Sequence, residues 1–110
     1  MLIVLLDEPT LFVYESLEEA AGSIEPPDAE AEVRAAFDER AVPYRVEWIR
    51  PNRRGRFLGI RYVSAGDYRW MPAGPPDREA LIRLIQAHPA TDPPDAGAQL
   101  AELVAKLRAV

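Results

Sequence analysis

Leu2-Ile3-Val4-Leu5-Leu6 is an unbroken apolar run, and the polar stop Asp7-Glu8-Pro9 follows it directly. A run of this length is typical of a β-strand, because a helix in a globular domain needs about ten residues or more. A strand that is apolar at every position, rather than at alternate positions, is typical of one covered on both faces of its sheet. We therefore expect residues 2–6 to form a central strand around which the rest of the chain packs.

The next segment predicts a short strand or strand extension and then a helix. Leu11-Phe12-Val13-Tyr14 either continues the first strand after a bend or forms a second strand. Ser16 and Glu19 have the spacing of a capping box, in which the serine hydroxyl accepts from the Glu19 amide and the Glu19 carboxylate reaches back to the serine amide. The pattern predicts a helix over residues 17–24, which Pro26-Pro27 ends.

Residues 29–38 are compatible with two structures. Residues 29–37 are rich in helix formers, and Asp28 stands where it could cap a helix. Apolar residues also recur at every second position from Val33 to Phe37, and again across residues 42–48 beyond a polar turn, which indicates a hairpin. The hairpin is favoured because helix propensity is a weak determinant, and the helix remains open.

The second half predicts a meander followed by two helices. Strands are expected at residues 42–50, 56–63 and 68–72, with turns at residues 51–55 and 64–67. Asp77 and Asp95 are positioned to cap two C-terminal helices, whose apolar residues recur at helical spacing.

The order of elements predicts an α+β fold, with a mostly antiparallel sheet of four to five strands and helices packed on one face, two of them C-terminal. A chain of 110 residues has the size of one domain, so we expect residues 1–110 to form a single domain.

Charge is divided along the chain. The 13 basic and 18 acidic side chains give a net charge of −5, but residues 1–40 carry −9 and residues 41–83 carry +5. The strongest local feature is a group of arginines on one predicted hairpin, flanked in the pattern by Trp48 and Trp70; its members are Arg50, Arg53, Arg54 and Arg56.

Residue types that carry common catalytic chemistry are scarce. The chain has no cysteine, which excludes disulfides, thiolate metal sites and cysteine nucleophiles. His88 is the only histidine, and its place at the predicted end of a helix favours a role as a partner of the last carbonyls. The glycines are scattered, and the alternating acids Asp28, Glu30 and Glu32 have no loop glycine among them, as a calcium loop requires. We expect no enzymatic activity, no cofactor and no metal.

The length of the apolar runs and the start of the sequence bear on localisation. None approaches the roughly 20 residues that span a membrane. The opening run is too short for a secretory signal and has no basic region before it. The expectation is therefore a cytoplasmic protein with no membrane partner.

One set of local motifs is similar to a known group. The stretch Phe12-Val13-Tyr14-Glu15-Ser16-Leu17-Glu18-Glu19-Ala20, with Ile24-Glu25-Pro26 and Ala36-Phe37-Asp38, resembles small bacterial immunity proteins encoded beside polymorphic or contact-dependent toxins. The resemblance covers about the first half of the chain, and its motifs are structural. It implies an antitoxin that blocks a cognate toxin by occluding its active site.

Two surfaces are candidates for partner binding. Acidic residues around the first helix would speed association with a basic toxin, and they include Glu15, Glu18 and Glu19. Aromatic and arginine side chains on rigid strands are common binding hot spots, and the candidates here are Trp48, Trp70, Arg53, Arg54 and Arg56. The alternatives are an assembly domain that self-associates, which includes a homodimer, and a nucleic-acid binder that uses residues 50–56, which the acidic net charge disfavours.

Overall fold

A computed structural model describes residues 1–109 of the chain. The helices are α1 (Leu17–Ser23), α2 (Pro26–Glu32), α3 (Arg78–Ala87) and α4 (Ala96–Arg108). The strands are β1 (Leu2–Leu5), β2 (Leu11–Tyr14), β3 (Ala35–Asp38), β4 (Tyr44–Arg50), β5 (Arg53–Phe57), β6 (Ile60–Ser64), β7 (Asp67–Pro72) and β8 (Thr91–Asp92). The α+β class is confirmed, and no helix among residues 1–109 is long and apolar enough to cross a membrane.

The largest sheet has the strand order β3-β1-β2-β8, with β1 inside it. β1 pairs antiparallel with both neighbours, so that Ile3 lies opposite Val13 on β2 and Phe37 on β3. β8 joins the edge of β2 in the parallel sense. The prediction of a central first strand is confirmed, whereas the sheet has mixed strand directions and is not simply antiparallel. The remaining strands form separate two-stranded ribbons, β4–β7 and β5–β6.

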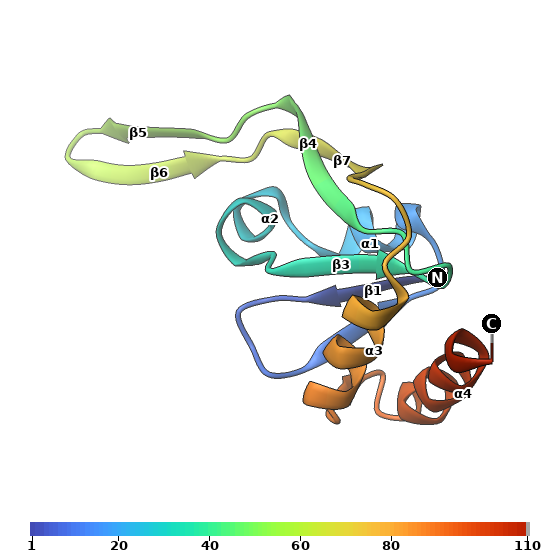
Figure 1. The fold of residues 1–110 in the computed structure, drawn as a ribbon. Helices are drawn as coiled ribbons and strands as arrows, with labels where there is room; N and C mark the ends of the chain where they lie inside the picture. The colour runs from blue at the N-terminus through green and yellow to red at the C-terminus, as the bar shows by residue number, and fades with distance from the viewer. Residues whose placement is uncertain (110) are drawn as a thin grey trace.

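Alternate residues of β1 enter two different cores. Leu2 and Val4 are fully buried with residues of α1, α2 and β7, whereas Ile3 is fully buried with residues of α3 and α4. Figure 1 shows α1 and α2 on one side of this sheet and α3 on the other. The expectation that helices cover one face is therefore wrong. A strand that is apolar on both faces needs a cover on each face.

Ser16 and Asp77 cap α1 and α3 as predicted, whereas the predicted capping of α4 by the Asp95 side chain is wrong. The Ser16 hydroxyl accepts from the Glu19 amide at 3.0 Å, but the Glu19 carboxylate accepts from the amide of Glu15 at 2.7 Å rather than from that of Ser16. Asp77 accepts from the Ala80 amide at 3.0 Å, as a cap of α3. His88 lies just after α3, where its Nδ1 is 2.8 Å from the Leu84 carbonyl oxygen. Asp95 precedes α4 without a capping hydrogen bond from its side chain.

Residues 29–38 contain both of the structures considered for them. α2 ends at Glu32, and β3 begins at Ala35. The favoured hairpin is wrong, because β3 pairs along its length with β1, and its strand pairing with the following segment is limited to one bridge, between Phe37 and Pro43. Pro26-Pro27 begins a helix instead of only ending one, since proline is well suited to the first helical turn.

The predicted meander is replaced by one long, interrupted ribbon. β4 pairs with β7, and farther out β5 pairs with β6, so the chain runs outward, turns once and returns. Residues 53–55 are strand rather than turn, and the reversal lies at Leu58-Gly59. Figure 1 shows β5 and β6 projecting from the body, which accounts for overall dimensions of 59 × 27 × 20 Å.

Truncation of a buried leucine tests this division between core and projection. Leu81 is fully buried against the face of β1 that carries Ile3, so Leu81→Ala should lower the free energy of unfolding by about 2–5 kcal/mol. Leu58 is 87% exposed, and the control Leu58→Ala should change it by less than about 0.5 kcal/mol. Denaturant unfolding monitored by circular dichroism measures both. Equal losses in the two variants would contradict this assignment of the core.

Candidate functional site

We call residues 53–64, which comprise β5, the turn and β6, the arm. The pairing register divides its side chains between two faces, because residues directly opposite each other point to the same side of a ribbon. Arg54 lies opposite Val63, and Arg56 lies opposite Arg61; these four residues form the basic face. Gly55 lies opposite Tyr62, and Phe57 lies opposite Ile60; these four form the apolar face.

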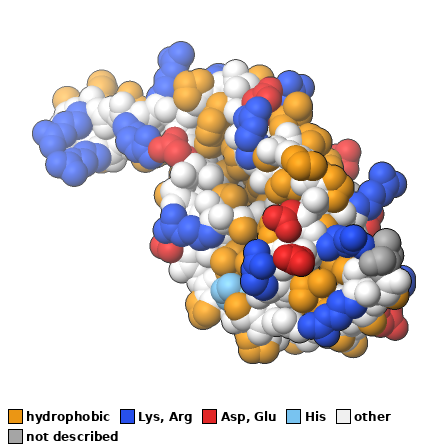
Figure 2. Space-filling model, viewed as in Figure 1, with side chains coloured by type: hydrophobic (Ala, Val, Ile, Leu, Met, Phe, Trp, Pro, Cys, Tyr) orange, Lys and Arg blue, Asp and Glu red, His pale blue; other side chains and the backbone are white. Residues whose placement is uncertain are grey.

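The apolar face is exposed to solvent. Phe57 and Ile60 are each 71% exposed. Every large hydrophobic side chain that the described residues expose lies on the arm except Ile49, which belongs to β4. Figure 2 shows hydrophobic and basic side chains gathered together on the projection. Exposed apolar side chains that lie together mark an interaction surface more often than a structural one.

Gly55 lets the Tyr62 ring lie flat against β5. A Cβ atom at Gly55 would come within 2.5 Å of the Tyr62 hydroxyl oxygen and 2.6 Å of the ring carbon that bears it. An aromatic ring that covers a glycine on the opposite strand is a recognised device for stabilising a ribbon. The arm therefore has an internal packing contact of its own on its apolar face.

The turn at the tip presents a leucine in an unfavourable conformation. Leu58 and Gly59 have φ angles of +52° and +78°, so both central residues of the turn are left-handed, as in a type I′ hairpin. Glycine adopts this region freely, whereas a leucine pays roughly 1–2 kcal/mol. Asparagine would suit the position better, so the leucine is not explained by the stability of the turn.

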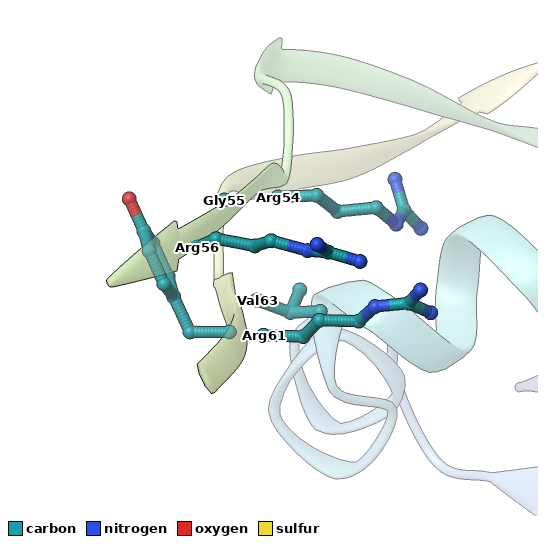
Figure 3. A pocket seen from close by; sticks show the side chains of 6 residues that line it. Arg54, Gly55, Arg56, Arg61 and Val63 are labelled. Atoms are coloured by element: carbon teal, nitrogen blue, oxygen red, sulfur yellow. The ribbon is translucent and has the colours of Figure 1, made fainter. Parts of the chain in front are cut away.

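The basic face is not neutralised at its outer end. Arg56 and Arg61 are directly opposite each other, and neither forms an ion pair with any residue in the range 1–109. Like charges at opposing positions destabilise a ribbon. Figure 3 shows the Arg54, Arg56 and Arg61 side chains extending in the same direction. They border an open hollow of about 510 Å³, which is also lined by Gly55, Tyr62 and Val63.

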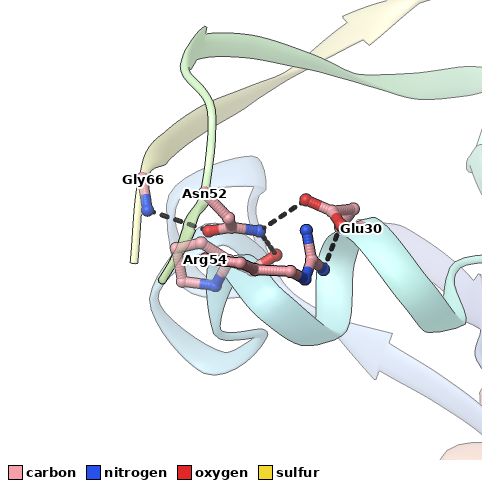
Figure 4. A network of polar contacts seen from close by, with 5 residues as sticks. Glu30, Asn52, Arg54 and Gly66 are labelled. Atoms are coloured by element: carbon pink, nitrogen blue, oxygen red, sulfur yellow. Dashed lines mark hydrogen bonds and ion pairs between the residues drawn. The ribbon is translucent and has the colours of Figure 1, made fainter. Parts of the chain in front are cut away.

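A polar network fixes the base of the arm to α2 (Figure 4). The Asn52 side-chain amide donates to the Pro26 carbonyl at 3.1 Å and to the Glu30 carboxylate at 2.9 Å, while its oxygen accepts from the Gly66 amide at 2.9 Å. Arg54 donates to the other oxygen of the Glu30 carboxylate. The hydrogen bonds from Arg54 and then Asn52 hold the pKa of Glu30 below its usual value. We call Glu30, Asn52 and Arg54 the latch.

Two further features shape the junction between the arm and the β4–β7 ribbon. Gly66 is buried where the backbone of the opposite strand comes so close that a Cβ atom would lie 2.0 Å from the Arg50 carbonyl oxygen. Arg50 also pairs with Asp67 at 2.9 Å. The break in the ribbon is thus built around a position that accepts only glycine without displacement.

The predicted hot-spot residues separate into two groups. Arg53, Arg54 and Arg56 all lie on β5, as exposed members of the arm. Trp48 is half-buried, and Trp70 is only 6% exposed and belongs to the core, so the expectation of Trp70 as a surface contact is not met. The alternation of β7 explains the difference, because Tyr68 and Trp70 share its inward face.

Tyr68 ties this inward face to α1. Its ring makes edge contacts with Trp48 and Trp70, with centroid distances of 5.6 and 6.0 Å. Its hydroxyl donates to the Ile24 carbonyl, and burial raises the pKa of Tyr68 to about 12. The aromatic residues therefore anchor the ribbon that carries the arm.

The acidic candidates are not brought to the arm. Glu15, Glu18 and Glu19 are exposed at the start of α1, where Glu19 is engaged by the Glu15 amide. The arginines of the arm and its base pair instead with Glu30 and Asp67. The predicted acidic surface and the arginine hairpin remain two separate features.

Sequence reasoning did not identify Glu30, Asn52, Leu58 or Arg61 as functional candidates. The alternation of residues 53–57 and 60–64 around Leu58-Gly59 was the available signal, because a two-residue loop ending in glycine is typical of a tight hairpin. The Pro51-Asn52 pair obscured it by resembling a turn.

The acidic side chains and His88 were also considered as possible metal ligands. In the part of the chain that the structure describes, no group of three or more histidine, aspartate or glutamate side chains could hold a metal ion. Comparison of the chain with protein-family models, curated proteins and solved structures finds no match. The functional conclusions therefore rest on the geometry of the arm.

Substitution of glycines tests the junction. Gly66→Ala should destabilise the protein by about 1–3 kcal/mol, because the added methyl group meets the backbone at Arg50. The matched control Gly97→Ala adds a methyl group in α4 with nothing within 4 Å, and it should stabilise by about 0.5–1 kcal/mol. Thermal unfolding measures both changes. A neutral Gly66→Ala would show that the close approach at the junction is wrong.

Proposed function

We propose that this chain is a non-enzymatic binding protein whose recognition element is the arm, and that its partner is another protein. The observation that carries the proposal is the concentration of exposed large hydrophobic side chains, including Phe57, Leu58 and Ile60, on one projecting hairpin. Binding of a partner to such a surface is favourable because it removes apolar area from water, which contributes about 25 cal/mol per Å² of apolar area buried.

The construction of the arm supports binding rather than internal stability. A two-stranded hairpin on its own is at best marginally stable in water. Here it carries an unneutralised arginine pair and a leucine in a left-handed conformation. Strained or repulsive features that the fold does not need are typical of functional sites.

The charge distribution favours a partner other than a second copy of this chain. Two arms paired edge to edge would bring their basic faces onto one side of a shared sheet, with arginines beside arginines. None of the exposed large hydrophobic side chains of the described residues lies outside the segment 49–63, so the body offers no matching cluster to the arm of another copy.

The specific role we propose is that of an immunity protein that binds and blocks a toxin in the cytoplasm, as the resemblance of the first half implies. A projecting arm that inserts into a concave active site would occlude it, which is how a non-enzymatic protein inhibits an enzyme. The acidic residues Glu15, Glu18 and Glu19 then provide a separate surface that would accelerate association with a basic toxin.

Leu58→Asn is the variant that separates folding from recognition. Asparagine followed by glycine is the preferred type I′ pair, so the arm should fold at least as well as before while the most exposed of its apolar side chains is removed. We expect tagged wild-type chain to co-purify from its host with one partner protein, and Leu58→Asn to lose that partner without a loss of thermal stability. Arg83→Asn, on the exposed side of α3, should retain it.

The partner then decides the specific role. Its expression should arrest growth, and co-expression of the wild-type chain, but not of Leu58→Asn, should restore growth. Partner binding that is unaffected by Leu58→Asn would contradict the role of the arm. A partner that binds through the arm but does not impair growth would contradict the immunity role alone.

A further inference from the structure

The basic face of the arm lies opposite its apolar face and carries charged side chains that a hydrophobic contact does not use. Arg54, Arg56 and Arg61 project from the side of the ribbon opposite to Phe57, Ile60 and Tyr62. The apolar side chains account for a hydrophobic contact, but they leave the guanidinium groups of Arg56 and Arg61 unexplained. A ligand of this face has to be anionic.

The arginines differ in how far the chain neutralises them. At the base, Arg50 pairs with Asp67 and Arg54 pairs with Glu30. Farther out, Arg56 and Arg61 face each other without an acidic partner in residues 1–109. The Arg54 pair and the direction of the three side chains in Figure 3 place their guanidinium groups on the side of the arm toward α2. An anion bound there would replace the repulsion between Arg56 and Arg61 with charge-assisted hydrogen bonds.

The size of the hollow and the open edges of the arm suit an extended chain rather than a single small anion. The open hollow of about 510 Å³ extends along both strands from Arg54 to Arg61. β5 and β6 pair only with each other, so each keeps an open edge whose backbone groups can pair with an added strand. A strand laid along this edge would carry side chains every ~6–7 Å on one face, which suits successive arginines on the ribbon.

The negative charge of the rest of the chain favours a peptide over a nucleic acid as the ligand of the basic face. Residues 50–66 contain five arginines and no acidic residue, and since the whole chain is −5, the remainder carries −10. Duplex DNA carries one negative charge per ~1.7 Å, so a duplex on the arm would also bring phosphates toward the acidic body. A short peptide segment can confine its carboxylates to the arm. Guanidinium groups bind carboxylates through paired hydrogen bonds.

We propose that the basic face binds an acidic segment of the partner protein, an extended stretch whose aspartate or glutamate carboxylates pair with Arg56 and Arg61. This inference rests on the proposed function, since it specifies the part of the partner that the arm recognises. The partner would thus present an apolar site to the tip and acidic side chains to the opposite face of the same hairpin.

Arg56→Glu tests the inference without unfolding the arm. The substitution places a carboxylate opposite Arg61, and an opposite-charge pair at this position stabilises the ribbon. The control Arg83→Glu makes the same change in net charge on α3, where Arg83 is 72% exposed. The probes are a fluorescent glutamate-rich peptide of about ten residues, long enough to extend beyond β5, and a single-stranded oligonucleotide of similar length.

Fluorescence anisotropy with the full chain at low and moderate salt gives the outcome. We expect the peptide to bind the wild type and Arg83→Glu within about twofold of each other, to bind Arg56→Glu about tenfold more weakly, and to weaken as salt rises. Tighter, Arg56-dependent binding of the oligonucleotide would overturn the inference in favour of nucleic acid. Absence of peptide binding, or equal binding by Arg56→Glu, would overturn it as well.

The two proposals fail separately. If Leu58→Asn loses the protein partner while the peptide does not bind, the arm is the recognition element but its basic face does not take an acidic segment. If the peptide binds through Arg56 while Leu58→Asn retains the partner, the basic face binds acidic segments as proposed. Leu58 at the turn is then not needed for binding the partner.

Discussion

The burial of β1 on both faces is the constraint on which the rest of the structure depends. Leu2 and Val4 need one apolar cover, and Ile3 needs another. The chain provides α1, α2 and the β4–β7 ribbon on the first side, and α3 and α4 on the second. Together these elements cover both faces of β1. The arm extends beyond these elements, and its large hydrophobic side chains remain exposed.

The arm is exposed but held at its base. Tyr68 and Trp70 fix β7 in the core, and the latch joins the start of β5 to α2 through Asn52 and Glu30. A projecting element that is anchored in this way loses less conformational entropy on binding than a free loop would. Rigidity at the base and exposed apolar area at the tip are both properties that a recognition element needs.

The sequence was most informative where local chemistry acts alone. The uniform apolar run of residues 2–6 predicted the buried central strand, and Ser16 and Asp77 predicted the starts of α1 and α3. It was least informative where one segment could pair with either of two others. The alternation around Phe37 did indicate a strand, but this strand pairs with β1 rather than with β4.

The candidate site was partly predictable for the same reason. A cluster of arginines is visible in composition, so Arg53, Arg54 and Arg56 were identified. Which face each residue occupies depends on register, and the position of the turn at Leu58-Gly59 sets that register. The predicted turn at residues 51–55 separated Arg61 from the other arginines of the arm. The strand at residues 68–72 was predicted, but its inward face was not assigned, so the burial of Trp70 was not foreseen.

Amide hydrogen exchange of the free chain and of its complex with the co-purified partner shows whether the arm is the surface that the partner covers. We expect the amides of residues 53–64 to exchange rapidly in the free protein, because the hairpin is marginally stable, and to become protected in the complex more than those of any other segment. Protection confined to the body, with the arm exchanging as in the free chain, would contradict the claim that the arm is the recognition element.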